Sequence, residues 1–185
     1  MSEHADLPQV RGSWVRHGTD ALLRRRFFAV RSDLVTTPAG TEGRYDWVDA
    51  PDLVRVAAIT AAGEIYLIRQ HHYLPDRTFL QLPGGGVEPG ETPLQAAARE
   101  LAEEVGATGT LTICGTVWPM PGLTASRTHL VRADVRELSA ASPEESEADL
   151  QAVNLPISEA VAAANDGRIV CAASALLVLQ LATFR

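Results

Sequence analysis

The sequence has few cysteines, no long apolar run and no excess of positive charge, and each shortage excludes a class of protein. Its 185 residues include two cysteines, Cys114 and Cys171, which are too few for a disulfide framework and lack the C-x-x-C spacing of a metal site. We expect both to be small buried thiols in a reducing cytoplasm. No segment approaches the roughly 18 apolar residues of a membrane helix, and the first twenty residues lack the apolar core of a signal peptide.

The net charge of −7 argues against a broad basic surface that grips nucleic-acid phosphates. We therefore expect neither a nucleic-acid partner nor a membrane partner, and an anionic substrate would need local help from a metal ion or a few arginines. Hydrophobic residues make up 46% of the chain and charged residues 21%, as in globular proteins. The length suits one domain with a small appendage.

The first 50 residues predict a small β region. Between Trp14 and Trp47, short apolar pieces alternate with turn residues, which indicates a few strands too small to stand alone. We expect them to pack on the main domain or on a partner subunit. The run Arg24 to Arg26 is either a solvated strand edge, the favoured interpretation, or a contact to a substrate phosphate.

Residues 51–185 predict one α/β domain. Strand-like runs surround a central helix, and two helical segments close the chain. This order predicts a mixed sheet covered on both faces. The expected strands are 53–60, 64–70, 78–83, 111–118, 127–135 and 150–156, and the expected closing helices are 157–167 and 172–183.

The central helix has well-specified ends. Thr92 is a good N-cap, Pro93 suits the first helical position, Gln95 completes a capping box and Gly106 ends the helix. One face at helical spacing should pack on the sheet. The residues of that face are Leu94, Ala97, Ala98, Leu101 and Val105.

Three glutamates, Glu100, Glu103 and Glu104, crowd the same helix, and its period places them on an arc away from the apolar face. Like charges at this spacing repel each other, although a solvated surface helix tolerates them. The preceding glycines at 84–86 favour a different interpretation, because they let backbone approach the carboxylates closely. Hard oxygen ligands beside an exposed carbonyl are what Mg²⁺ or Mn²⁺ requires.

The stretch from Gly85 to Ala107 resembles the Nudix hydrolase signature, G-x5-E-x7-R-E-U-x-E-E-x-G-U, where U is aliphatic. Only its last position departs, where Ala107 replaces a larger aliphatic residue. The order of the surrounding strands also resembles the Nudix α/β/α sandwich. The matching positions are Gly85, Glu91, Arg99, Glu100, Leu101, Glu103, Glu104 and Gly106.

The resemblance implies metal-dependent hydrolysis of a diphosphate linked to another group. It makes Glu100 and Glu104 the principal metal ligands, with Glu103 binding a further metal or orienting water and the carbonyl of Gly84 completing the shell. Arg99 would pair with Glu91 and hold the loop against the helix, in place of an ordinary surface ion pair.

Outside the signature, the chain is most similar to the ADP-ribose and ADP-sugar pyrophosphatase branch, whose N-terminal strands commonly build a homodimer. The resemblance implies a cytoplasmic homodimer that produces a nucleoside monophosphate and a sugar phosphate. Candidate substrate-binding residues are Arg69, Gln70, His72, Trp118 and Arg127, and Trp14, Phe27 and Phe28 are candidates for stacking on a base.

Three departures from that branch leave the substrate open. The segment Pro83-Gly84-Gly85 replaces Pro-Ala-Gly, His72 replaces an arginine, and a glutamate common near Ser126 is missing. For His71 and His72 we favour a structural or solvent-exposed role in a loop, and Trp118 is equally a core aromatic. The catalytic base is either a signature glutamate or one of Glu144, Glu145 and Glu147.

The alternative functions are a Nudix pyrophosphatase for a nucleoside triphosphate or another nucleotide sugar, and a noncatalytic Nudix module that senses a nucleotide. The complete glutamate set disfavours the second of these.

Overall fold

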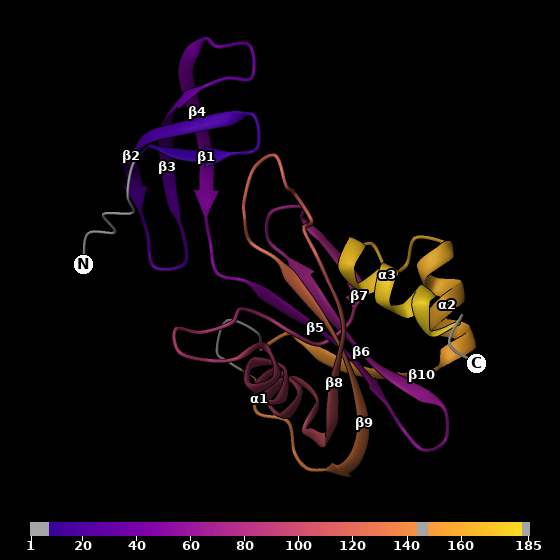
Figure 1. The fold of residues 1–185 in the computed structure, drawn as a ribbon. Helices are drawn as coiled ribbons and strands as arrows, with labels where there is room; N and C mark the ends of the chain where they lie inside the picture. Colours follow the sequence, from indigo (N-terminus) through magenta and orange to yellow (C-terminus); the bar gives the residue numbers. More distant parts are fainter. Residues whose placement is uncertain (1–7, 144–147, 183–185) are drawn as a thin grey trace. The chain divides into compact units, whose positions relative to one another are not determined.

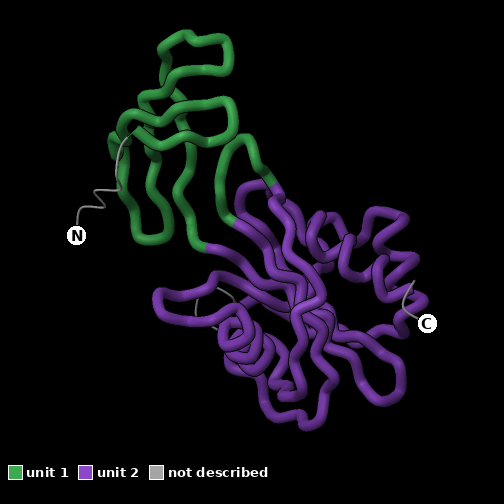
Figure 2. The backbone as a smooth tube through the Cα atoms, in the orientation of Figure 1, with its two compact units in different colours: residues 1–51, 120–126 green, residues 52–119, 127–185 purple. Residues whose placement is uncertain are grey.

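The computed structural model describes residues 8–143 and 148–182, which form two compact units (Figure 2). Unit 1 comprises residues 1–51 and 120–126, and unit 2 comprises residues 52–119 and 127–185. The boundary predicted after residue 50 lies beside this division. Sequence reasoning had assigned residues 120–126 to the main domain, whereas the structure places them in unit 1.

Unit 1 is an antiparallel sheet in the order β1-β2-β3-β4. Its strands are β1 Gln9–Arg11, β2 Trp14–Arg24, β3 Ala29–Thr36 and β4 Glu42–Asp49. The segment 120–126 attaches to β4, because the N–H of Val48 donates to the carbonyl of Leu123 at 2.8 Å and the Tyr45 hydroxyl donates to the carbonyl of Gly122 at 2.9 Å. A segment distant in sequence thus completes this small unit.

In its described residues, unit 2 contains a six-stranded mixed sheet and the helices α1, α2 and α3 (Figure 1). Its main path runs β10-β6-β5-β9-β8, and β7 pairs with β6. The pairing of β5 with β9 is parallel, and the other pairings are antiparallel. The elements are β5 Leu53–Ile59, β6 Glu64–His72, β7 Arg77–Gln81, α1 Pro93–Val105, β8 Ala107–Val117, β9 Thr128–Leu138, β10 Gln151–Pro156, α2 Ile157–Asn165 and α3 Ala172–Leu181.

Two apolar cores cover the two faces of this sheet. Leu101 and Val105 of α1 pack with Val54, Val56 and residues of β6 and β9 on one face. Ala57 of β5 and residues of β6 and β9 pack with α2 and α3 on the other face. The alternation along β5 explains the arrangement, since successive side chains of a strand point to opposite faces. The predicted α/β/α sandwich with a mixed sheet is therefore confirmed.

Some local predictions were wrong. His71 and His72 lie within β6, where they pair with Thr78 and Arg77, and do not form a loop. Cys114 is exposed on β8, and Cys171 is only partly buried, so the expectation of two buried thiols fails. Among the described residues, no helix has the length and apolar character needed to cross a bilayer.

Candidate functional site

Helix α1 is capped as its sequence predicts. The Thr92 hydroxyl accepts from the N–H of Gln95, the Gln95 side chain accepts from the N–H of Thr92, and Gly106 ends the helix at a φ of 71°. Gly106 suits this left-handed conformation because it has no Cβ. These caps fix where the helix begins and therefore how its carboxylates are placed relative to the loop before it.

The buried face of α1 differs from the predicted one. Leu94 and Ala98 are exposed, whereas Glu100 and Glu104 are buried with exposed fractions of 8% and 2%. The helix touches the sheet along one side and the loop 84–91 along another, so the carboxylates lie under that loop and not in solvent. The helical period alone does not show this second contact, but the glycines at 84–86 had indicated a close approach of backbone to the carboxylates.

The glycines before α1 make room for these carboxylates. A Cβ on Gly85 would lie 2.4 Å from Oε1 of Glu100, so any larger residue would displace that carboxylate. The N–H of Gly84 donates to Oε2 of Glu104 at 2.6 Å. Gly84 has a φ of 135°, and a Cβ there would meet the carbonyl oxygen of Val54. The glycine loop therefore closes over both buried glutamates.

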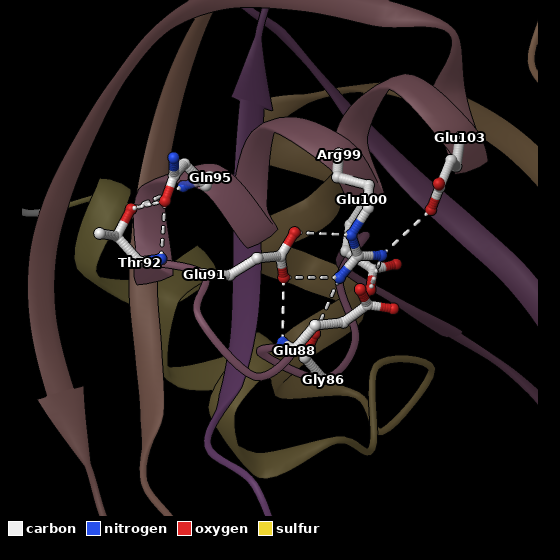
Figure 3. A network of polar contacts seen from close by, with 8 residues as sticks. All are labelled: Gly86, Glu88, Glu91, Thr92, Gln95, Arg99, Glu100 and Glu103. Atoms are coloured by element: carbon white, nitrogen blue, oxygen red, sulfur yellow. Dashed lines mark hydrogen bonds and ion pairs between the residues drawn. The ribbon is translucent and has the colours of Figure 1, made fainter.

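Arg99 connects the loop to the helix (Figure 3). Its Nε donates to Glu91 Oε1 at 2.9 Å, its Nη1 donates to Glu100 and Glu103 at 2.9 and 3.2 Å, and its Nη2 donates to the Gly86 carbonyl at 2.9 Å. The Arg99 hydrogen bonds hold the pKa of Glu91 below its ordinary value, and the hydrogen bond to Glu91 raises the pKa of Arg99. The predicted pairing of Arg99 with Glu91 is present in the structure.

The charges of this cluster fit a divalent cation. Glu91, Glu100, Glu103 and Glu104 supply four carboxylates, whereas Arg99 supplies one positive charge. Buried carboxylates require compensation by a cation, and hard oxygen donors suit Mg²⁺ or Mn²⁺. Within the described ranges, no three His, Cys, Asp or Glu side chains already stand in metal-binding geometry. Arg99 holds Glu100 and Glu103 through hydrogen bonds from its Nη1.

The Gly84 carbonyl, predicted to be a metal ligand, accepts a hydrogen bond from Arg55 Nη1 in this structure. Arg55 lies on β5 and also approaches Cys171. Burial raises the pKa of the Cys171 thiol, but the Arg55 charge and the hydrogen bond with Ser174 outweigh this effect and the pKa lies below its ordinary value. Sequence reasoning did not single out Arg55, because nothing near it in the chain indicates its contact with the glycine loop.

A second network lies at the starts of β5 and β9, and the sequence did not indicate its pairings. Arg127 donates to Asp52 Oδ2 from Nε at 3.0 Å and from Nη2 at 2.7 Å, and Nε2 of the buried His129 lies 3.1 Å from the same oxygen. Burial raises the pKa of Asp52, but the hydrogen bonds from Arg127 and His129 outweigh it and lower the pKa overall. The Asp52 carbonyl accepts from Val87 N–H at 2.8 Å, which ties this network to the glycine loop.

The predicted substrate-binding residues are dispersed in unit 2. Arg127 is paired with Asp52, Arg69 is exposed on β6, and Trp118 is 55% exposed after β8, so Trp118 is not a core aromatic. The His72 ring stacks on Phe79 with centroids 4.1 Å apart. Burial lowers the pKa of His72, and the charges of Arg55 and His71 lower it further, which favours a neutral imidazole. Gln70 is partly buried on β6.

Unit 1 holds an aromatic pocket of about 410 Å³. Trp14, Tyr45 and Trp47 line it together with the returning segment 121–125, and the rings of Trp14 and Tyr45 meet edge to face at 5.7 Å. The buried Nε1 of Trp47 has no hydrogen-bond partner among the described residues. Of the three stacking candidates, Trp14 lies in this pocket, whereas Phe27 and Phe28 line a different hollow.

The candidate bases Glu144, Glu145 and Glu147 lie outside the described residues.

Comparison with known proteins supports one family. A model of the NUDIX domain matches residues 50–171. An "ADP-ribose pyrophosphatase" of Bacillus subtilis (strain 168) is 34% identical over 101 residues, which is 54% of this chain and 55% of that protein. This match thus spans about half of the Bacillus protein. An "ADP-ribose pyrophosphatase" of Mycobacterium tuberculosis (strain ATCC 25618 / H37Rv) is 31% identical over 146 residues, covering 77% of this chain and 70% of the relative.

Among solved structures, an "ADP compounds hydrolase" has a similar fold. Its TM-score is 0.75 at 23% sequence identity, and the match covers 90% of this chain and 91% of that chain. The similarity therefore includes both the mixed sheet with its helices and most of the N-terminal residues.

Proposed function

This chain belongs to the Nudix family, and we propose that it is a divalent-metal-dependent pyrophosphatase for a nucleoside diphosphate linked to a sugar. ADP-ribose or an ADP-sugar is the first candidate substrate, and the products are a nucleoside monophosphate and a sugar phosphate. Two relatives carry the name ADP-ribose pyrophosphatase, which supports this choice. Nudix hydrolases as a family use divalent metal ions, and for this chain we propose Mg²⁺ or Mn²⁺.

One observation carries the proposal: Glu100 and Glu104 are buried beneath the glycine loop that precedes their own helix. Carboxylate oxygens held in fixed positions beneath a backbone loop suit a divalent cation such as Mg²⁺, which takes hard oxygen ligands. When bound, the metal neutralises phosphate oxygens and lowers the pKa of a bound water. Glu100, Glu103 and Glu104 would hold it, while Arg99 and Glu91 keep the loop in place.

For a nucleoside ligand we propose the aromatic pocket of unit 1 as a binding site. Its volume is within the range of small-molecule sites, and its tryptophan and tyrosine rings offer faces on which a base stacks. The buried Nε1 of Trp47 supplies a donor for an acceptor atom of the ligand. We further propose that the enzyme is a cytoplasmic homodimer whose N-terminal residues 1–50 contribute to the subunit contact.

A panel of substrates tests the activity. ADP-ribose, ADP-hexoses, other nucleotide sugars and nucleoside triphosphates are each incubated with Mg²⁺ or Mn²⁺, and the phosphorylated products are identified. Highest kcat/KM for ADP-ribose or an ADP-sugar supports the proposal. A preference for triphosphates would favour the alternative that Gly84, in place of the usual alanine, suggests. Binding without turnover would identify a nucleotide sensor. Size-exclusion chromatography with light scattering measures the molar mass in solution and tests the proposed dimer.

A further inference from the structure

The turn between β2 and β3 concentrates positive charge in an otherwise acidic chain. The chain contains no lysine, so all 16 of its basic residues are arginines, and three of them are consecutive at Arg24, Arg25 and Arg26. Arg25 uses one nitrogen to donate to the carbonyl of Arg24. In the part of the chain that the structure describes, none of these three side chains forms an ion pair with a carboxylate, in contrast to Arg31 on β3.

These arginines surround a hollow of about 360 Å³ in unit 1. Arg31 also lines it and is held in place by Asp49, whose Oδ2 lies 2.5 Å from Nε. Four guanidinium groups and the one carboxylate of Asp49 give the lining a net charge of +3. A hollow with this charge favours an anion with more than one negative charge.

Two phenyl rings in the same lining are exposed to solvent. Phe27 is 69% exposed and Phe28 is 41% exposed, and the guanidinium carbon of Arg26 lies 4.9 Å from the centre of the Phe27 ring. The turn is closed by a hydrogen bond of 2.8 Å from Arg25 N–H to the carbonyl of Phe28. The lining therefore offers flat apolar faces beside the positive charges.

We propose that this hollow is a nucleotide-binding site distinct from the aromatic pocket of unit 1, and that its ligand is a nucleoside diphosphate or a similar phosphate-bearing aromatic compound. Guanidinium groups bind phosphate oxygens in pairs, and phenyl and guanidinium faces stack on a base. The hollow is large enough for part of a small ligand. A net chain charge of −7 opposes binding to an extended polyanion, and a concave lining suits a discrete molecule better than a bilayer. The site does not depend on the proposed hydrolysis.

Calorimetric titration of the full chain in EDTA tests the site, with ADP, inorganic pyrophosphate and adenosine as separate titrants. The charge variant is R24Q/R25Q/R26Q, and the ring variant is F27S/F28S. The matched control R132Q/R136Q/R168Q removes the same number of arginines from unit 2. We expect a site for ADP whose affinity falls about tenfold or more in the charge variant and stays unchanged in the control. The ring variant should weaken ADP while leaving pyrophosphate binding unchanged.

Equal ADP affinity in the wild type, the charge variant and the control would overturn the proposal. So would a loss of adenosine affinity in the charge variant as large as the loss for ADP, because adenosine carries no phosphate, or binding to vesicles of phosphatidylserine and phosphatidylcholine without binding of ADP. Loss of dimers in the charge variant without a loss of nucleotide binding would assign the turn to a contact between copies. Circular dichroism confirms folding of each variant, and R26Q alone replaces the charge variant if that does not fold. Because no metal is present, these outcomes are separate from any failure of hydrolysis.

Discussion

The carboxylate site of unit 2 and the aromatic pocket of unit 1 are built in opposite ways. The first comes from one continuous stretch, in which the loop 84–91 folds back over α1 and Arg99 joins the two. The second needs strands β1 to β4 and also residues 121–125, which return from far along the chain. The proposed metal ligands therefore depend on contacts within one stretch of the chain, whereas the proposed nucleoside pocket depends on contacts between segments far apart in sequence.

Replacing a buried carboxylate of α1 should have the largest effect. Glu104→Gln keeps an oxygen that can accept from Gly84 N–H but removes the negative charge, so we expect kcat to fall about 10³-fold with the fold intact. Turnover at saturating Mg²⁺ and a thermal melt measure the two effects. Glu137→Gln on the exposed end of β9 is the matched control and should leave kcat unchanged. Normal turnover in Glu104→Gln would refute the assignment.

Adjacent glycines give a second test of the local site. In Gly85→Ala the new Cβ collides with the Glu100 carboxylate, whereas a Cβ on Gly86 meets no atom within 4 Å. We expect Gly85→Ala to lose about 10- to 100-fold in metal affinity or activity, as disruption of a supporting contact does. Gly86→Ala should resemble the wild type. Steady-state kinetics with metal titration measure both, and similar losses in the two variants would contradict the close approach.

The ion pair between Glu91 and Arg99 should contribute mainly to stability. We expect Glu91→Gln to reduce the free energy of unfolding by about 1 to 2 kcal/mol at neutral pH. Because folding lowers the pKa of Glu91, its contribution is complete above the ordinary value of 4.5 and disappears as the pH falls through the lowered value. Urea unfolding at pH 7 and pH 3 measures the free energy of unfolding of the wild type and of Glu91→Gln. If this free energy falls between pH 7 and pH 3 by the same amount in both proteins, the ion pair is not coupled to folding.

The smallest effect is expected in unit 1. Trp14→Ala removes one ring from the aromatic pocket and should raise KM about three- to tenfold, because stacking on a base is worth about 1 to 3 kcal/mol and the remaining rings compensate in part. The value of kcat should hardly change, since Trp14 is not part of the carboxylate site. Trp14→Phe keeps a stacking face and should recover most of the affinity. If kcat falls and KM stays constant in Trp14→Ala, Trp14 contributes to the chemical step and not to binding, which contradicts the prediction.

The sequence predicted the helix ends because capping contacts join residues close in the chain, and the pairing of Arg99 with Glu91 followed from the resemblance to the Nudix signature. It also predicted the mixed sheet, since alternation along β5 and the turn before β6 are local patterns. It failed for Leu94 and Ala98, whose exposure depends on how the loop and the sheet share the surface of α1. It could not find the bond between Arg55 and Gly84 or the contact of His129 with Asp52, because such partners meet only after the strands pair.

The return of residues 120–126 to unit 1 limits how the protein can be shortened. A truncated chain beginning at Asp52 would retain that segment but lose β4, and the Leu123 and Gly122 carbonyls would lose the donors from Val48 and Tyr45. Such a fragment would be poorly suited to expression as an independent module unless the loop were also replaced. Transfer of β1 to β4 into another protein faces the same demand, because the segment 120–126 must be transferred with them.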